Sequence, residues 1–497
     1  MKMKVVIVGA GVVGSSIARV LSMYDNFDII LVEKEPDVGW GASKANTSII
    51  HPGHEEEPNI HPHRAKLCKE GNRLWRQWAR ELDIPVKWPG ELMIFYNSEE
   101  EKIARKYIEL AKSNNIPGVR IFYQEELRKM EPSINPNAIG AVYAPTAGII
   151  SPFEAVIAIV ENAVDNGVRL LTETKVEGIK IAEGRVRGVM TNMGFIEADI
   201  VINAAGIYSD EISSMAGVDS GFTVRPRRGE YLLFDEDIRI KPERILHTIP
   251  TPISKGVYAI TTIHGNLMIG PTAEDLSVEA KEDTSTSEIG LEYLWNEAGK
   301  LLREPPSRTK VIRTFAGLRP EPPDGHWLIE AYTEPFGFIN VAGIRSPGFT
   351  SSPALAHHVV NLIKAKYDIN LVMKRKWNPY RSDIAKVGHM SLREADKLIS
   401  ENPDYGEIVC YCKTVSKAEI LEAIKRMKKI GLKTVTLDGI KFRTGAGLGT
   451  CQGSFCRCRI ALLISKYMDI PLHKVVVKKK PYGIGEVKEL LKTERSE

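Results

Sequence analysis

The sequence predicts a mixed α/β (α+β) protein in which a parallel sheet with flanking helices is interleaved with an antiparallel sheet and followed by a small helical domain. Three observations predict this fold. An apolar strand, a glycine-rich turn and an amphipathic helix open the chain at residues 5–21, alternating apolar strands recur between residues 228 and 320, and five of the six cysteines lie after residue 409. A chain of 497 residues is too long for one hydrophobic core, so two or three domains are expected.

The composition is that of a globular enzyme, with 43% hydrophobic and 26% charged residues. A net charge of +4 is small for this length and gives no indication of a nucleic-acid partner. No apolar run reaches the roughly twenty residues of a transmembrane helix, and the opening MKMKVVIVGAG reads as a first strand rather than a signal peptide. We therefore expect a cytoplasmic protein with reduced thiols, attached to a membrane at most through a partner. Glutamine occurs only three times, which is typical of thermophilic proteins.

The first strand leads into a dinucleotide-binding motif. Val5 to Val8 are followed by Gly9-x-Gly11-x-x-Gly14, and a second apolar strand ends at the acid Glu33. In a Rossmann-like fold the glycines permit a tight turn, a close approach of the backbone to a pyrophosphate, and packing of helix on strand, while the acid accepts a hydrogen bond from a ribose hydroxyl. The arrangement predicts dinucleotide binding; the alternative is a tight strand–helix turn without a ligand.

Four further segments resemble the D-amino-acid-oxidase-like superfamily of FAD enzymes. GWGASKANTSIIHPGH (39–54) resembles the segment beneath the flavin, and VINAAGIYSDEIS (201–213) resembles the strand and turn that return to the dinucleotide. TFAGLRPEPPDG (314–325) resembles the substrate-side strand, and FINVAGIRSPGFTSSPALAHHVVNLI (338–363) resembles the last strand and flavin-facing helix. The resemblance implies FAD as the cofactor.

The resemblance also implies domain limits and a set of FAD-binding residues. The FAD domain is expected at about 1–85, 140–215 and 325–375, the substrate domain at about 86–139 and 216–324, a linker at 376–405, an iron–sulfur domain at 406–470 and a tail at 471–497. The implied FAD-binding residues are Gly9, Gly11, Gly14, Glu33, Lys34, Ser43, Asn46, Thr47, Val176, Ala205, Gly206, Gly343, Gly348, Phe349 and Thr350.

Four residues are candidates for the substrate site. Arg319 in GLRP and Arg345 in GIRSPG lie in segments expected at the flavin, and an arginine fork suits a carboxylate or phosphate. For each, the alternative is a structural ion pair with an acid such as Glu321 or Glu330. His51 is the candidate base because a neutral imidazole accepts a proton near pH 7, although it could instead only pack against the flavin. Tyr258 is an alternative on the covering sheet.

Two substrate classes fit the resemblance. NAAGIYSD, RRGEYLLF and GPTAED resemble the L-2-hydroxyglutarate dehydrogenases, whereas the whole architecture resembles the cysteine-bearing flavin subunit of anaerobic, FAD-dependent glycerol-3-phosphate dehydrogenase. Where aerobic glycerol-3-phosphate dehydrogenases carry Gly-Gly-x-Arg-Tyr after the histidine, this sequence reads Pro52-Gly53-His54-Glu55. Glycerol 3-phosphate is the expected small anionic substrate, and an L-2-hydroxy acid or an amino acid is the alternative.

The C-terminal cysteines form a second motif. Cys410-x-Cys412 is followed about forty residues later by Cys451-x4-Cys456, and between them Ser416 is a candidate N-cap of an amphipathic helix. Four thiolates in two close pairs can bind a zinc ion or a binuclear iron cluster. CYCK together with TGAGLGTCQGSFCRCR resembles the 2Fe–2S domain of bacterioferritin-associated ferredoxin, which favours a 2Fe–2S cluster over zinc or redox-active thiols.

Two classes of function remain open from the sequence. The first is a FAD-dependent dehydrogenase that passes electrons from the flavin through its own cluster to an electron-acceptor protein or additional redox subunits. The second is a non-catalytic subunit that relays electrons within a larger complex. Reduction of the bound flavin by substrate in the isolated chain distinguishes them.

Overall fold

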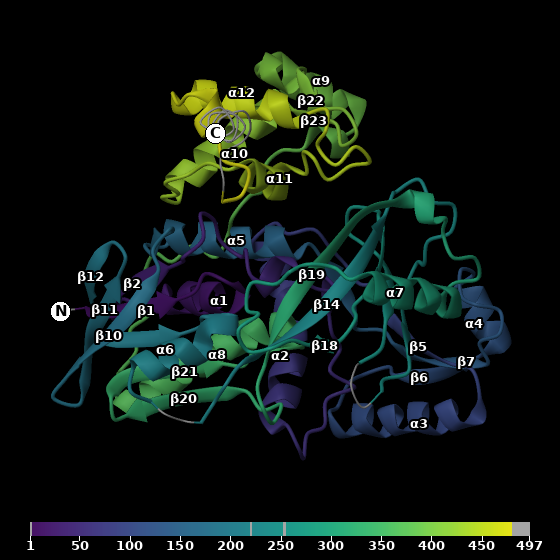
Figure 1. The fold of residues 1–497 in the computed structure, drawn as a ribbon, viewed down its shortest axis with the longest axis horizontal. Helices are drawn as coiled ribbons and strands as arrows, with labels where there is room; N and C mark the ends of the chain where they lie inside the picture. Colours follow the sequence, from purple (N-terminus) through teal and green to yellow (C-terminus); the bar gives the residue numbers. More distant parts are fainter. Residues whose placement is uncertain (1, 219–220, 252–254, 480–497) are drawn as a thin grey trace, which may run out of the picture. The chain divides into compact units, whose positions relative to one another are not determined.

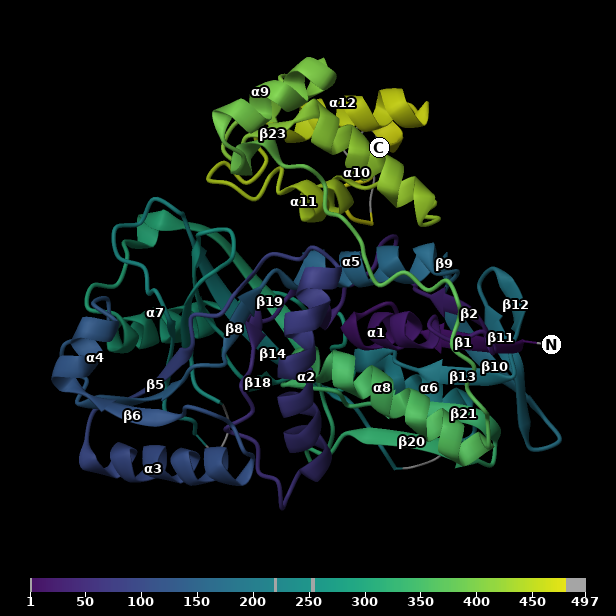
Figure 2. The same ribbon diagram turned by 180° about the vertical axis from the view of Figure 1, so that it is seen from behind.

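The computed structural model describes residues 2–218, 221–251 and 255–479. The chain divides into two compact units (Figures 1 and 2). Unit 1 contains the residues before Glu33 together with Gly39–Val168 and Lys175–Arg381, and unit 2 contains Glu33–Val38, Arg169–Thr174 and the residues after Arg381. Among the described residues, no helix is long and apolar enough to cross a membrane.

The first sheet of unit 1 has a parallel centre in the order β21-β13-β1-β2, with β11 beside β21. Val5, Val6 and Ile7 of β1 are fully buried because the strand is covered on both faces, as is typical of a parallel sheet. The strands are β1 (Met3–Val8), β2 (Phe27–Val32), β9 (Arg169–Leu171), β10 (Val176–Ala182), β11 (Arg185–Thr191), β12 (Gly194–Glu197), β13 (Ile200–Asn203), β20 (Leu328–Thr333) and β21 (Phe336–Ala342). The predicted Rossmann-like sheet is confirmed.

Two glycines of the first turn are required by close packing. A Cβ at Gly14 would lie 2.0 Å from the carbonyl oxygen of Gly9, so only glycine lets α1 (Val12–Leu21) start this close to β1. Gly9 has φ +103°, and a Cβ at this position would lie 2.6 Å from the carbonyl oxygen of Ala204. The spacing of this motif therefore fixes the helix against the sheet and against the loop after β13.

The second sheet of unit 1 has the order β18-β14-β17-β16-β15-β5-β7-β6, with β19 paired to β14 along its length. Its strands come from two separated parts of the sequence, so the chain leaves the first sheet and returns to it. They are β5 (Glu91–Phe95), β6 (Arg120–Tyr123), β7 (Gly140–Ala144), β14 (Arg225–Phe234), β15 (Ile245–Thr248), β16 (Tyr258–Thr261), β17 (Leu267–Gly270), β18 (Glu274–Asp275) and β19 (Val311–Glu321).

A small third sheet and eight α-helices complete the described part of unit 1. The helix α2 packs on α8, and α8 packs on α1, which brings these three helices together on one side of the first sheet (Figure 2). The third sheet contains β3 (Ile49–Ile50), β4 (Val86–Lys87) and β8 (Gly148–Ile150). The helices other than α1 are α2 (Pro62–Glu81), α3 (Ser98–Ser113), α4 (Gln124–Met130), α5 (Pro152–Asp165), α6 (Ser209–Met215), α7 (Glu288–Leu301) and α8 (Gly348–Tyr367).

Unit 2 is mainly helical. The predicted cap at Ser416 is confirmed: its hydroxyl accepts from the backbone N–H of Glu419, and the Glu419 carboxylate accepts from the backbone N–H of Ser416. Ile420, Ile424 and Met427 of the capped helix are fully buried. Its elements are β9 (Arg169–Leu171), α9 (Leu392–Glu401), β22 (Ile408–Cys410), β23 (Val415–Ser416), α10 (Lys417–Lys429), α11 (Leu437–Thr444) and α12 (Arg457–Met468).

Candidate functional site

The turn after β1 forms a cradle for a dinucleotide phosphate. The backbone N–H of Val12, at the start of α1, donates to the Ser43 hydroxyl at 2.9 Å, and a Cβ at Gly11 would lie 3.1 Å from the same oxygen. Gly11 has no side chain, and it caps α1 without a side-chain hydrogen bond. The turn and the first N–H groups of α1 therefore fit a pyrophosphate, as the sequence predicts.

Glu33 follows directly after β2, whose last residue Val32 pairs with Val8 of β1. This register puts the acid at the same edge of the sheet as the glycine turn. One oxygen of its carboxylate accepts from the backbone N–H of Glu35 at 3.0 Å. Its role toward the adenosine ribose remains a prediction.

Three segments that the sequence predicts at the flavin meet in unit 1. The backbone N–H of His51 donates to the Thr350 hydroxyl at 2.9 Å, which ties the 42–51 segment to the start of α8. A Cβ at Gly317 on β19 would lie 2.0 Å from the Ala45 carbonyl oxygen, so β19 crosses directly against the same segment. The tertiary fold thus brings His51, the N-terminus of α8 and the strand that carries Arg319 to one place.

The remaining predicted FAD residues occupy different settings. Asn46 uses its amide to order its own segment: its nitrogen donates to the Ser43 carbonyl at 2.8 Å and its oxygen accepts from the Ser48 N–H. The Phe349 ring stacks on Trp75 at 5.2 Å, so this ring has a protein partner. Ala205 and Gly206 follow β13, Gly343 follows β21, Val176 begins β10, and Lys34 and Thr47 lie in the loops after β2 and before β3.

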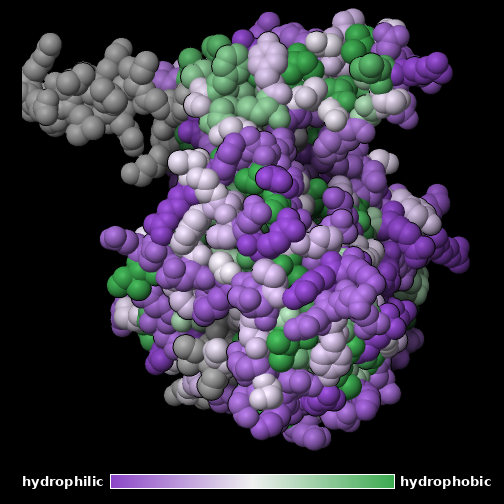
Figure 3. All heavy atoms as spheres, turned by 90° about the vertical axis from the view of Figure 1, so that its right-hand side faces the viewer, coloured by the Kyte–Doolittle hydropathy of each residue, from purple (hydrophilic) through white to green (hydrophobic). Residues whose placement is uncertain are grey.

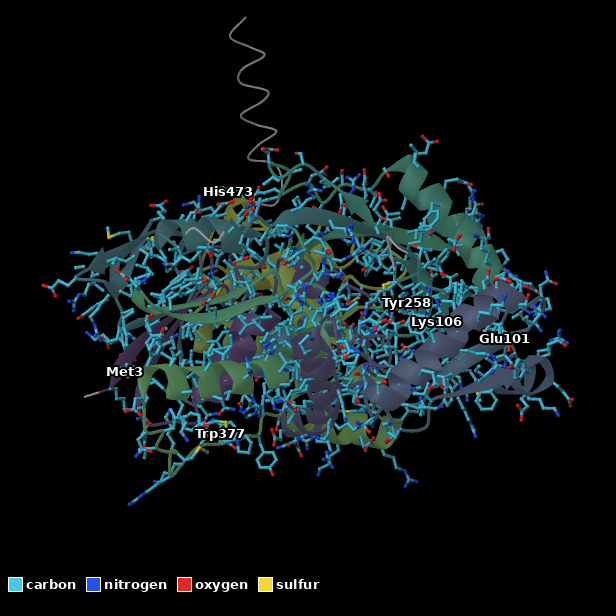
Figure 4. All side chains as sticks on the ribbon, turned by 90° about the horizontal axis from the view of Figure 1, so that it is seen from below. Met3, Glu101, Lys106, Tyr258, Trp377 and His473 are labelled. Carbon is cyan, nitrogen blue, oxygen red and sulfur yellow. The ribbon has the colours of Figure 1, made fainter. Side chains whose placement is uncertain are left out.

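A buried cluster of polar and aromatic side chains surrounds His51. Within the described part of the chain, the Nδ1 atom of His51 and the hydroxyl of Tyr258 (labelled in Figure 4) are buried without a hydrogen-bond partner. Their rings meet edge to face at 6.3 Å, and His247 stacks on Tyr258 at 4.7 Å. Buried polar groups are normally paired, so these free atoms indicate a polar ligand. The structure brings the predicted His51 and Tyr258 together.

Burial controls the protonation of this pocket. Burial first, and charge repulsion from the nearby Lys255 ammonium second, lower the pKa of His51 to about 4. Burial likewise raises the pKa of Tyr258 well above its ordinary value. At neutral pH the pocket therefore holds an unprotonated imidazole, able to accept a proton, beside a protonated phenol, able to donate a hydrogen bond.

The sequence did not reveal a charged cluster next to this pocket. The Lys255 ammonium lies 3.3 Å from the Glu55 carboxylate and 2.5 Å from that of Glu56, which also accepts from Arg64 at 2.6 Å. Burial opposes ionisation of Glu55, but the Lys255 charge and the neighbouring imidazoles, His247 first among them, together outweigh it and hold the pKa of Glu55 at about 2. The one signal in the sequence was the acidic run after His54. Lys255 stands in a loop whose sequence has no motif.

The two predicted arginines differ. Arg345 lies with its Nε 3.1 Å from the Glu321 carboxylate, so it has an ion-pair partner. Arg319 donates to the Thr272 carbonyl and, within the described residues, has no carboxylate at ion-pair distance. Tyr231 lies close enough to Arg319 to influence its charge and packs in one core cluster with Tyr258. Arg319 is therefore the arginine with charge available for an anionic ligand.

The C-terminal thiols of unit 2 form two pairs. The Cys412 and Cys451 sulfurs are 3.4 Å apart. A hydrogen bond from the Cys456 thiol, together with backbone N–H groups of Gly447 and Lys413, lowers the pKa of Cys410 to about 6 despite burial. Among the described residues, no three His, Cys, Asp or Glu side chains gather to hold a single metal ion. Two thiol pairs suit a binuclear cluster, in which two irons share four cysteines.

The backbone near these thiols passes close to the sulfur atoms and donates hydrogen bonds to them. A Cβ at Gly449 would lie 2.5 Å from the Cβ of Cys412, so glycine is needed where the loop passes this ligand. Backbone N–H groups of Phe455 and Gly453 donate to the Cys451 sulfur and lower the pKa of this thiol. Such donors stabilise thiolates and tune cluster potentials, so the residues present fit an iron–sulfur cluster. Cys458 is exposed and has no such setting.

A dinucleotide cradle, a buried acid–base pocket and a four-thiol site together define a flavoprotein oxidoreductase with its own iron–sulfur domain. The chain belongs to the FAD dependent oxidoreductase (DAO) family, which residues 4–362 match. Residues 408–466 match the BFD-like 2Fe–2S binding domain. The predicted cofactors, FAD and a 2Fe–2S cluster, and the predicted FAD-dependent dehydrogenase class are confirmed, while the roles of individual residues remain predictions.

Known relatives cover both domains. The chain is 37% identical to a glycerol 3-phosphate dehydrogenase of Caloramator mitchellensis over 95% of each chain. It is 26% identical to a subunit of the anaerobic glycerol-3-phosphate dehydrogenase of Escherichia coli K12, over 93% of this chain and 88% of the relative. The structure of L-α-glycerophosphate oxidase from Mycoplasma pneumoniae with FAD bound is similar with a TM-score of 0.71 and 26% identity, over 77% of this chain and 99% of that chain.

Proposed function

We propose that the protein oxidises glycerol 3-phosphate to dihydroxyacetone phosphate and passes the electrons through its 2Fe–2S cluster to a partner protein. The observation that carries the proposal is the pocket of His51, in which a free, unprotonated ring nitrogen lies beside a cationic lysine. The activity named for the Caloramator relative, which is similar over nearly the whole chain, supports this choice of substrate.

The residues of the chain have distinct tasks in this proposal. Bound FAD, held at the glycine turn and the first N–H groups of α1, would supply the acceptor for the hydride from the carbon that bears the hydroxyl group. His51 takes the hydroxyl proton at its free Nδ1, and the Tyr258 hydroxyl donates a hydrogen bond to the substrate oxygen. Arg319 provides positive charge for the phosphate, in place of the arginine that the HPGHE segment lacks.

The proposed base makes a prediction about pH. Because burial lowers the pKa of His51 to about 4, the ring is unprotonated above that pH, so the rate of flavin reduction at saturating glycerol 3-phosphate should persist through pH 6.5 and fall only as the pH approaches about 4. The saturated rate is measured because kcat/KM would also report the second ionisation of the free substrate phosphate, at about pH 6. The measurement is anaerobic stopped-flow flavin reduction from pH 4 to 8, with flavin absorbance as a check on folding. The pKa of His54 is also lowered to about 4, so His54→Gln is the control and should retain the acid limb. An acid limb near pH 6.5 would contradict the assignment.

The substrate is tested on the isolated chain without oxygen. Glycerol 3-phosphate is expected to bleach the flavin absorbance fully, whereas L-2-hydroxyglutarate and glycine should not. Bleaching by one of the other two compounds instead would reassign the substrate and leave the fold unchanged. No bleaching by any of them would favour an electron-relay subunit. We also propose that the protein acts in the cytoplasm, where reducing conditions keep its cysteines available as cluster ligands.

A further inference from the structure

An exposed aromatic and basic face surrounds the cluster ligands of unit 2. Tyr411 stands between Cys410 and Cys412 and is 61% exposed, and Phe455 directly precedes Cys456 and is 51% exposed. Their rings lie 5.3 Å apart, so residues from the two ends of the motif form one patch. We call this surface the cluster face and define it by four residues, Tyr411, Phe455, Arg459 and Leu462.

The helix α12 extends the cluster face. Its inner side is buried through Ile460 and Ile464, whereas Leu462 is 56% exposed. The Arg459 guanidinium lies over the Phe455 ring at 4.6 Å and over the Tyr411 ring at 5.6 Å, which holds the cation on the aromatic patch. Figure 3 draws hydrophobic residues in green and shows that unit 2 exposes such residues at its surface. Exposed aromatic residues and arginine are the composition enriched in protein–protein interfaces.

Charge indicates what kind of partner fits this face. Residues 382–479 contain 18 Lys and Arg against 10 Asp and Glu, whereas Asp and Glu outnumber Lys and Arg in residues 1–381. The positive charge is thus concentrated in the part of the chain that carries the cluster. A basic surface around a redox centre speeds the encounter with an acidic protein and disfavours a basic one.

We propose that the cluster face is the docking site of a small acidic one-electron carrier protein. The inference rests on the proposed export of electrons through the cluster. Each glycerol 3-phosphate oxidised to the ketone releases two electrons and two protons, and two carriers take one electron each. Tyr411 and Phe455 are chain neighbours of the ligands, so a carrier seated on them comes within a few side-chain lengths of the iron. The interface is expected to be small and salt-sensitive, as transient electron-transfer contacts are.

The test uses the full-length holoenzyme and two commercial carriers, acidic rubredoxin and basic cytochrome c. The enzyme is reduced with dithionite and freed of excess reductant, so the result does not depend on the natural substrate. Stopped-flow mixing then follows the colour change of each carrier at several salt concentrations. Rubredoxin reduction should be fast at low salt and slow as salt rises, and Arg459→Glu should slow it by roughly tenfold at low ionic strength.

Two further variants keep the outcome decisive. Leu462→Asp lies one turn beyond Arg459 and away from the ligands, and should also slow rubredoxin reduction. Lys428→Glu is the matched charge control and should leave the rate of rubredoxin reduction unchanged. Lys428 is exposed and lies near the end of α10, roughly 16 Å along the helix axis from the start of α10 beside β23. Equal loss in Lys428→Glu, or faster reduction of cytochrome c than of rubredoxin at low salt, would overturn the proposal.

The rate of electron transfer from the flavin to the cluster shows whether the cluster face serves a partner protein or unit 1. In Arg459→Glu the cluster should still be reduced by the flavin at the rate of the unaltered enzyme. If that step slows instead, the face serves unit 1 rather than a partner, and the proposal is wrong. If glycerol 3-phosphate fails to reduce the flavin, the proposed substrate is lost, yet the rubredoxin measurement on dithionite-reduced enzyme still decides the docking site.

Discussion

Cys451→Ala is expected to remove the 2Fe–2S cluster and abolish electron transfer to a protein acceptor while the flavin is still reduced by substrate. Cys451 lies 3.4 Å from Cys412, and loss of one of four thiolates leaves an iron without its ligand. Alanine is preferable to serine because a serine oxygen can itself bind iron. Flavin reduction should persist because the glycine turn with Ser43 and the segment of His51 with Thr350 lie in unit 1.

Iron and acid-labile sulfide analysis provide the measurement. The unaltered chain should contain two of each, in keeping with its 2Fe–2S domain, and Cys451→Ala should contain close to none. Cys458→Ala is the matched control, because this thiol is exposed and has no place in the paired set, so its cluster should remain. The ligand assignment fails if Cys458→Ala loses iron or if Cys451→Ala keeps it. One zinc without sulfide in the unaltered protein would point to a different metal site.

Arg319→Ala is expected to lower kcat/KM for glycerol 3-phosphate. The loss of transition-state binding free energy should be about 2–5 kcal/mol, the range for removing one partner of a buried charge pair. Such a loss is a decrease of roughly 30-fold to several thousand-fold. The physical reason is that Arg319, alone of the two predicted arginines, has no carboxylate at ion-pair distance in the described part of the chain. The flavin should remain bound, because no contact of Arg319 involves the dinucleotide cradle.

Arg345→Ala provides the comparison for Arg319. Arg345 is paired with Glu321, so its removal is expected to change kcat/KM much less than the removal of Arg319. Added guanidinium chloride should restore part of the activity of Arg319→Ala, since the small cation can occupy the vacated place, and should do nothing for Arg345→Ala. Equal losses in both variants, or no rescue, would assign Arg319 a structural role.

The sequence was sufficient for features that depend on near neighbours along the chain. Gly14 acts within six residues, because its contact with Gly9 is built into the start of a helix after a strand. The cap of Ser416 by Glu419 is likewise a local hydrogen-bond pattern. The fold class was predicted from such local patterns, and the two cofactor domains from the resemblance of short segments to known FAD and 2Fe–2S families.

The long-range pairings were decided by the tertiary structure. Whether Arg319 or Arg345 is free depends on which side chain reaches Glu321, and both choices satisfy the same sequence. Lys255 joins Glu55 and Glu56 across about two hundred residues, and no local propensity records such a contact. Lys255 and the two glutamates form their ion pairs only when the second sheet has folded over the segment of His51. Burial then sets their protonation, because the cost of a buried charge depends on the surrounding protein rather than on neighbours in sequence.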